Sequence, residues 1–267
     1  MIQPVVPHGL SGELLHRIEE AAMEQAREVL TARRFLEFEG PLGAGVPSLQ
    51  VGDLIEESVD DEGTLIAARR ALPIPTLHAT FRLPTRELQG AQEHGFPLST
   101  GPAEDAAERV ALAEERLIYH GHADLGIGGL LNTSGAQRTA LSDWSNPGAA
   151  IGDVIAAADK LDAAGVHAPF ALVLAPTLYN QLFRKYEGSD VLALDHLRRL
   201  AAGGIYKSHV LRDTAALVSP DVGPLVCAQD LQVSFLDMAA DTVRFLVSSS
   251  VVLRLDDAAA VCVLARK

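Results

Sequence analysis

The sequence predicts an α+β protein, and three observations support that prediction. First, apolar residues recur at helical spacing in several segments between positions 11 and 202, which is typical of amphipathic helices. Second, positions 46–83 show little helical pattern and include Pro73 and Pro75, which exclude a helix there. Third, the chain after Ile205 is mostly made of short segments rich in Val and Leu, as strands are.

The first predicted element is one amphipathic helix over residues 11 to about 34. Ser11 has a side chain suited to an N-cap, and the glycine-rich residues 40–45 end the element in a loop. Its apolar stripe is formed by Leu14, Leu15, Ile18, Ala22, Ala26, Val29 and Leu30. A stripe of this kind must pack against another apolar surface.

An extended hairpin arm is predicted next. Two extended pieces, residues 49–55 and 64–72, flank Asp60-Asp61-Glu62-Gly63, which has the composition of a turn. An isolated two-stranded hairpin is only marginally stable in water. We therefore expect this arm to find its partner on another copy of the chain.

A long helix is predicted over residues 102–121, because Pro102 suits a first helical turn and apolar residues repeat along one side. We expect Glu104-Asp105 and Glu114-Glu115 to lie on its solvated face. The remaining predicted elements are helices over 147–164, 176–186 and 190–202, a buried strand over 170–175, and strands over 231–235, 242–247, 251–255 and 259–264.

Composition restricts the partners and the compartment. A net charge of −13 argues against duplex nucleic acid or an anionic membrane as the main partner, since both are recognised through basic surfaces. No apolar run approaches the roughly 20 residues of a membrane span, and the first residues lack the pattern of a secretory signal. We therefore expect a cytoplasmic protein, with Cys227 and Cys262 as buried free thiols.

The sequence offers no arrangement typical of catalysis or of cofactor binding. Gly126-Ile127-Gly128-Gly129 fits no phosphate-binding fingerprint, and neither an activated-serine elbow nor a His-Glu-x-x-His motif occurs. Glu13-x-x-His16 has the spacing of a di-iron motif, but a second copy is absent. We predict no catalytic residue, no metal site and no cofactor.

Two distant segments carry a resemblance to a known family. The first is Ala32-Arg33-Arg34-Phe35-Leu36-Glu37-Phe38-Glu39-Gly40-Pro41-Leu42-Gly43, and the second begins at Ala228-Gln229-Asp230-Leu231 and continues through Asp241-Thr242-Val243-Arg244-Phe245. Between them, Ala168-Pro169-Phe170-Ala171-Leu172-Val173-Leu174 follows in the expected order. Together they resemble the shell proteins of encapsulin nanocompartments, the linocin-like family, over essentially the whole chain.

The resemblance implies the fold of tailed-phage major capsid proteins, with an N-terminal helix, an E-loop arm, a peripheral domain around a spine helix, and an axial domain. The corresponding division of the chain is 1–45 for the helix and loop, 46–83 for the arm, 84–125 with 228–267 for the peripheral domain, and 126–227 for the axial domain. It also implies a hollow icosahedral homo-oligomer of about sixty copies.

The resemblance further implies that the shell encloses a cargo enzyme, such as a dye-decolourising peroxidase or a ferritin-like protein, through the cargo's C-terminal peptide. The residues it assigns to the peptide groove are Leu30, Arg33, Glu37, Asp230 and Leu231. Apolar pockets would come from the two leucines, and the charged side chains would fix the peptide's polar groups. The alternative is that Arg33, Glu37 and Asp230 form a network within one subunit that holds helix to sheet.

A pore loop is implied at Tyr186, Glu187, Gly188, Ser189 and Asp190, where repeated carboxylates around a symmetry axis would favour cations; an ordinary exposed loop is the alternative. Some family members bind flavin through an aromatic residue where this chain has Arg86, so flavin binding is not expected. The rival interpretations are a bacteriocin-like protease and a viral major capsid protein of the same fold.

Overall fold

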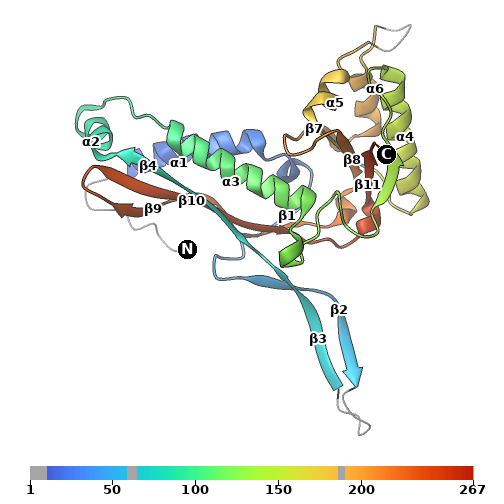
Figure 1. Ribbon diagram of the computed structural model, residues 1–267, viewed down its shortest axis with the longest axis horizontal. Helices are drawn as coiled ribbons and strands as arrows, with labels where there is room; N and C mark the ends of the chain where they lie inside the picture. The colour runs from blue at the N-terminus through green and yellow to red at the C-terminus, as the bar shows by residue number, and fades with distance from the viewer. Residues whose placement is uncertain (1–10, 59–64, 186–189, 267) are drawn as a thin grey trace.

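The computed structural model describes residues 11–58, 65–185 and 190–266. It contains three β-sheets, of four, five and two strands. The four-stranded sheet and two long helices form an elongated unit, the five-stranded sheet and its helices form a second unit at one end, and the two-stranded sheet projects as an arm (Figure 1). The α+β prediction is confirmed.

The N-terminal helix, α1 (Gly12–Val29), is shorter than expected. Ser11 caps it as predicted, because its hydroxyl accepts a hydrogen bond from the Leu14 N–H. The helix was expected to reach about residue 34, but Leu30 leaves the helical conformation and a separate 3₁₀ turn, η1 (Ala32–Arg34), follows. Hydrogen bonds from the Thr31 and Ala32 backbone to Glu115 hold this break.

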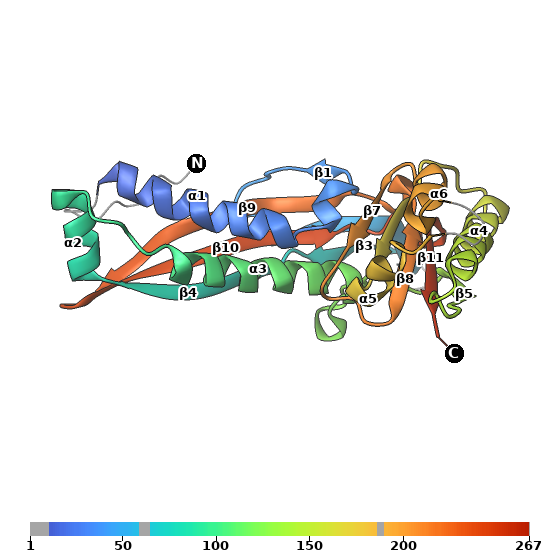
Figure 2. The same cartoon turned by 90° about the horizontal axis from the view of Figure 1, so that it is seen from above.

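The four-stranded sheet carries α1 and the spine helix α3 (Gly101–His120) on one face (Figures 1 and 2). Its strands, in spatial order, are β1 (Phe38–Glu39), β9 (Leu225–Met238), β10 (Thr242–Leu253) and β4 (Thr76–Pro84), and the short helix α2 (Thr85–His94) follows β4. The ring of Phe245 on β10 stacks on Phe81 of β4 with centroids 5.1 Å apart, under the helices. The predicted strands over 242–247 and 251–255 are thus one continuous strand.

The predicted arm is confirmed as an antiparallel hairpin of β2 (Ser48–Ser58) and β3 (Leu65–Pro73). It extends away from both units (Figure 1). Its base packs on a small apolar cluster that includes Leu72 and Ile74. The turn predicted at residues 60–63 lies outside the described residues.

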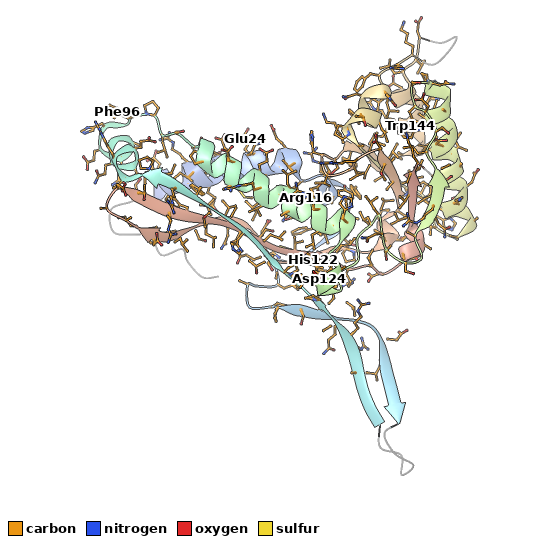
Figure 3. All side chains as sticks on the ribbon, viewed as in Figure 1. Glu24, Phe96, Arg116, His122, Asp124 and Trp144 are labelled. Atoms are coloured by element: carbon orange, nitrogen blue, oxygen red, sulfur yellow. The ribbon has the colours of Figure 1, made fainter. Side chains whose placement is uncertain are left out.

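The second unit is a five-stranded sheet flanked by three helices. The strands, in spatial order, are β5 (Gln137–Ala140), β11 (Val261–Ala265), β8 (Thr214–Val218), β6 (Ala171–Leu174) and β7 (Gly204–Lys207). The helices are α4 (Pro147–Ala163), α5 (Pro176–Gln181) and α6 (Ala193–Leu200), and single 3₁₀ turns form at η3 (Pro220–Val222) and η4 (Ala258–Ala260). A further 3₁₀ turn, η2 (Ala123–Leu125), follows α3 at the base of the arm. The core around Trp144 (Figure 3) fixes this unit. The two helices predicted on either side of residue 188 are shorter than expected.

Strand pairing departs from the predicted division of the chain at two strands. β4, assigned to the arm, is the edge of the four-stranded sheet, and β11, assigned to the peripheral domain, pairs with β8 and β5 in the second unit. In both cases the strand is placed by backbone pairing with segments distant in sequence. The exact domain boundaries stay a prediction.

Candidate functional site

Arg33 joins two of the main elements of the elongated unit. It lies on η1, and its Nε and Nη2 donate to the two carboxylate oxygens of Glu114 on α3 at 2.5 and 3.0 Å. Its Nη1 donates to Asp230 Oδ1 on β9 at 2.6 Å. Burial by itself would lower the pKa of Arg33, but the hydrogen bonds and charges of Glu114 and Asp230 raise it above the ordinary value. The predicted pair Arg33 and Asp230 is therefore brought together by the fold.

Glu114 is the third member of this network, and the prediction that it lies on a solvated face is wrong. Its side chain is 0% exposed. Besides Arg33 it accepts a hydrogen bond from the hydroxyl of Ser249 on β10 at 3.0 Å. No local pattern around Glu114 indicates this burial, because the groups that cover it come from η1 and β10.

Glu115 is also buried, contrary to prediction, and it faces different partners. Its Oε1 accepts hydrogen bonds from the backbone N–H groups of Thr31 (2.8 Å) and Ala32 (3.0 Å). Its Oε2 lies 2.5 Å from Thr31 Oγ1 and 3.0 Å from Oγ of Ser208, the residue that follows β7. Burial raises the pKa of Glu115, and the hydrogen bonds offset only part of that effect.

The two leucines of the predicted groove are not open to solvent. Leu30 is 6% exposed and Leu231 is 4% exposed, and both belong to the apolar core between the helices and the four-stranded sheet. Asp230 beside them is 51% exposed, and Glu37 is also exposed. Asp230 and Glu37 are therefore accessible, whereas Arg33 is 16% exposed and the two leucines lie in the core beneath them.

Phe38 is a residue that sequence reasoning did not single out. It lies on β1 and is 38% exposed, and the Arg33 guanidinium carbon lies 5.1 Å from its ring centroid. Leu42, shortly after β1, is also exposed. An accessible apolar surface therefore lies beside Arg33. In the sequence, Phe38 was marked only by its position next to Glu37, in the segment that carried the family resemblance.

Residues 186–189 of the predicted pore loop, Tyr186, Glu187, Gly188 and Ser189, lie outside the described residues. Asp190 is described and exposed, and its carboxylate lies 2.6 Å from Lys185 Nζ. An exposed pair of this kind contributes little to stability. The pore assignment stays a prediction.

The described part of the chain contains no group of three or more His, Cys, Asp or Glu side chains that could hold a metal ion. Cys227 and Cys262 are free and buried, as predicted. Burial raises the pKa of each thiol to about 11, so neither forms a ready nucleophile at neutral pH. Arg86, at the position expected to exclude flavin, is exposed on α2. Each helix within the described ranges is too short or too polar to traverse a lipid bilayer.

A spine helix on a long sheet, a second α/β unit and a projecting arm together form the fold of phage capsid proteins. Among solved structures, the virus-like particle from Pyrococcus furiosus is similar with a TM-score of 0.74, at 23% identity, covering 97% of this chain and 100% of that one. The capsid of the Myoviridae phage XM1 is similar with a TM-score of 0.64, at 17% identity, covering 90% and 92%. The predicted capsid fold is confirmed.

The family model described as "Encapsulating protein for peroxidase" (Linocin_M18) matches residues 9–252. The chain belongs to this family, the encapsulin shell proteins. It is 33% identical over 260 residues to the type 1 encapsulin shell protein EncA of Myxococcus xanthus, covering 93% of this chain and 91% of the relative. It is 31% identical over 262 residues to a diheme-cytochrome-encapsulin shell fusion protein of Kuenenia stuttgartiensis (93% and 72%). It is 28% identical over 207 residues to a ferritin-like-encapsulin shell fusion protein of Pyrococcus furiosus (76% and 56%).

Proposed function

We propose that the chain is the protomer of a hollow icosahedral shell of about sixty copies that encloses an enzyme and has no catalytic activity of its own. The observation that carries this proposal is the family match over residues 9–252 on a capsid fold. The shell would lie in the cytoplasm, and neither a metal nor a cofactor would be resident in it.

The projecting arm supports assembly on physical grounds. β2 and β3 pair only with each other among the described strands, and a lone hairpin is marginally stable. β4 likewise pairs only with β10 and leaves its other edge open within the described residues. In a closed assembly, neighbouring copies can cover both the isolated hairpin and the open strand edge.

For the cargo, we propose a peroxidase or a ferritin-like enzyme. The description of the family model names a peroxidase, and the Pyrococcus furiosus relative is fused to a ferritin-like part. A cargo expressed as a separate chain must carry its own recognition segment, and a C-terminal peptide supplies one.

The cargo peptide would bind the surface between the end of α1 and β9. Arg33, Glu37 and Asp230 would hold its polar groups, and Phe38 offers an accessible apolar contact. Leu30 and Leu231 would form the buried floor of the site. The network of Arg33 with Glu114 suits this role, because it fixes the guanidinium before any ligand arrives.

Size-exclusion chromatography with negative-stain microscopy tests the shell directly. We expect uniform hollow particles, with a copy number from native mass spectrometry, and co-purifying cargo identified by peptide mass spectrometry. A monomer or small oligomer in near-physiological buffer would contradict the proposal.

Asp230→Ala tests the cargo surface, with Asp256→Ala as the matched control. Both aspartates are about half exposed, and each pairs with an arginine that keeps a second carboxylate, Glu114 or Glu39. Loss of one charge-assisted hydrogen bond corresponds to roughly 10- to 100-fold weaker peptide binding. We expect less cargo per intact shell for Asp230→Ala alone. Equal loading of the two variants would favour the interpretation that the network only joins helix to sheet.

The loop of residues 186–190 would line a pore that favours cations, since Glu187 and Asp190 would repeat around the axis. Glu187→Gln should slow entry of Fe²⁺ into a ferritin-loaded shell and leave entry of a neutral solute unchanged. An unchanged iron rate would assign the loop to the ordinary protein surface.

A further inference from the structure

The side chain of Glu115 ties three separate parts of the molecule together. It projects from α3 and accepts hydrogen bonds from the backbone N–H groups of Thr31 and Ala32, in the turn after α1. It also contacts Ser208, which follows β7 of the five-stranded sheet. The Thr31 hydroxyl, 2.5 Å from Glu115 Oε2, also lies 2.8 Å from the hydroxyl of Tyr119. Glu115, Thr31 and Ser208 are all buried.

No cation balances a charge on Glu115. None of the ion pairs found among the described residues involves it. Arg33 of η1 is directed to Glu114 and Asp230, and Arg34 donates to the Arg27 carbonyl.

The remaining charged or titratable groups around Glu115 are also unsuited to balance its charge. Lys207 of β7 lies over the Tyr179 ring, and Glu114 is the neighbouring acid on α3. The facing titratable groups are Tyr119 of α3 and, beyond it, Tyr206 of β7, and burial together with the Glu115 charge raises the pKa of Tyr119. Among the described residues, the groups that hydrogen-bond to Glu115 are therefore all neutral dipoles.

We propose that Glu115 is a proton-operated latch between the turn after α1 and the five-stranded sheet, closed by the neutral acid and loosened when it ionises. This goes beyond the shell function, because it concerns the joint between the two units of one chain and needs no cargo.

Both carboxyl oxygens of Glu115 have hydrogen-bond partners when Glu115 is neutral. Oε1 accepts from the Thr31 and Ala32 N–H groups, and a proton on Oε2 is donated to Thr31 Oγ1. The Thr31 hydroxyl then donates onward to Tyr119, and the Ser208 hydroxyl donates to Oε2. The ionised form accepts from the same two N–H groups and from the Ser208 hydroxyl, and it also accepts from the Thr31 hydroxyl. Its cost is an unbalanced charge in the interior.

The direction of the pH dependence follows from the folded-state pKa. Burial raises the pKa of Glu115 in the closed structure above its value in an open, solvated state. A group whose folded-state pKa is raised contributes stability that is present in acid and is lost as the pH rises through the folded-state pKa. The joint is therefore tightest in mild acid and loosens towards alkaline pH.

Hydrogen–deuterium exchange on the purified, folded protein tests the latch at the amides of Thr31 and Ala32. After correction for intrinsic exchange rates, we expect wild-type protection of residues 30–35 to fall as the pH rises through the folded-state pKa of Glu115, which burial raises above the ordinary value of a glutamate. Glu115→Gln mimics the neutral acid: its carbonyl accepts from the two N–H groups and its amide donates to Thr31. We expect this variant to stay protected throughout. Glu108→Gln, a partly exposed acid on the same helix, is the control and should retain the wild-type profile.

Equal pH profiles for wild type and Glu115→Gln, or weaker protection of Glu115→Gln at pH 8, would overturn the proposal. The measurement does not require shells, so a chain that failed to assemble would contradict the proposed function and leave this test intact.

A second variant covers the case in which Glu115→Gln does not fold. Ser208→Ala removes a donor that stabilises the ionised carboxylate more than the neutral acid, so the loosening should move up by about one pH unit. A midpoint that stays or moves down would refute the latch. Infrared spectra should show a protonated carboxylic-acid band that wild type loses as the pH rises and that Ser208→Ala retains at higher pH, and a band that disappears at the same pH in both proteins would equally refute it.

Discussion

Replacing Arg33 by methionine should be among the most damaging single changes in the elongated unit. Methionine keeps most of the aliphatic volume but removes all the hydrogen bonds from the guanidinium to Glu114 and Asp230. Glu114 is 0% exposed, so its carboxylate would be left buried with Ser249 as its remaining donor. Breaking a buried pair by removing one partner costs about 3–5 kcal/mol. Asp230 can recover water and adds little to this cost.

The assay is the apparent melting temperature of assembled particles at a fixed scan rate, because unfolding of such assemblies is expected to be irreversible. At about 2–4 °C per kcal/mol for a chain of this size, Arg33→Met should melt about 6–20 °C below wild type. Arg254→Met removes an arginine whose carboxylate partners are 43% and 47% exposed, and it should cost no more than about 1 kcal/mol.

The double variant Arg33→Met/Glu114→Leu separates the two contributions. Replacing both partners by apolar groups avoids the unpaired carboxylate, so this variant should melt above Arg33→Met alone. A double variant as unstable as the sum of its single changes, or an Arg33→Met protein that melts like wild type, would refute the reasoning.

Three further predictions follow from local packing. Gly40 has φ +129°, and a Cβ there would lie 2.3 Å from the Cys227 carbonyl oxygen. Gly40→Ala should therefore lower the apparent melting temperature more than Gly43→Ala, because Gly43 has φ +109° but open space around it. Equal losses would mean that backbone strain of about 1–3 kcal/mol, and not the steric clash, causes the effect. With pKa values of about 11, Cys227 and Cys262 should not react with Ellman's reagent at pH 8 until the protein unfolds, and rapid labelling of native particles would contradict their burial. The single tryptophan, Trp144, is fully buried, so its emission should be blue-shifted and protected from iodide quenching; strong quenching of native particles would show that the second unit is open.

Local patterns along the chain were sufficient to predict the long helices, the arm and several strands, but not α2, β5 or β8, and not where each element ends. The stripe on α1 and the turn composition in the arm are local signals that each element carries by itself. The end of α1 at Val29 was missed because Leu30 suits the apolar stripe whether or not the helix continues. What breaks the helix is a carboxylate on α3, 84 residues away from Thr31 in sequence. Only the folded arrangement contains that information.

The candidate site was likewise predictable only in part from the sequence. Arg33 and Asp230 were selected through family resemblance, and the fold brings them within hydrogen-bonding distance. The resemblance could not show that Leu30 and Leu231 are covered by their own chain, because their burial depends on how closely α1 packs on the sheet. Accessible apolar surface lies instead at Phe38, on a two-residue strand too short to give a pattern of its own.

The burial of Glu114 and Glu115 has a geometric cause in the position of α3. Its first part packs into the core under α1, while Leu117 and Ile118 belong to the clusters at the base of the arm and in the second unit. The final turns of α3 are therefore covered on several sides and retain little solvent-exposed surface. Consecutive residues point about 100° apart on a helix, so the two acids meet different neighbours. Glu114 pairs with the guanidinium of Arg33, whereas the hydrogen bonds described for Glu115 come only from neutral N–H and O–H groups. One turn of one helix thus fixes the surface assigned to cargo and makes the joint to the five-stranded sheet depend on a single proton.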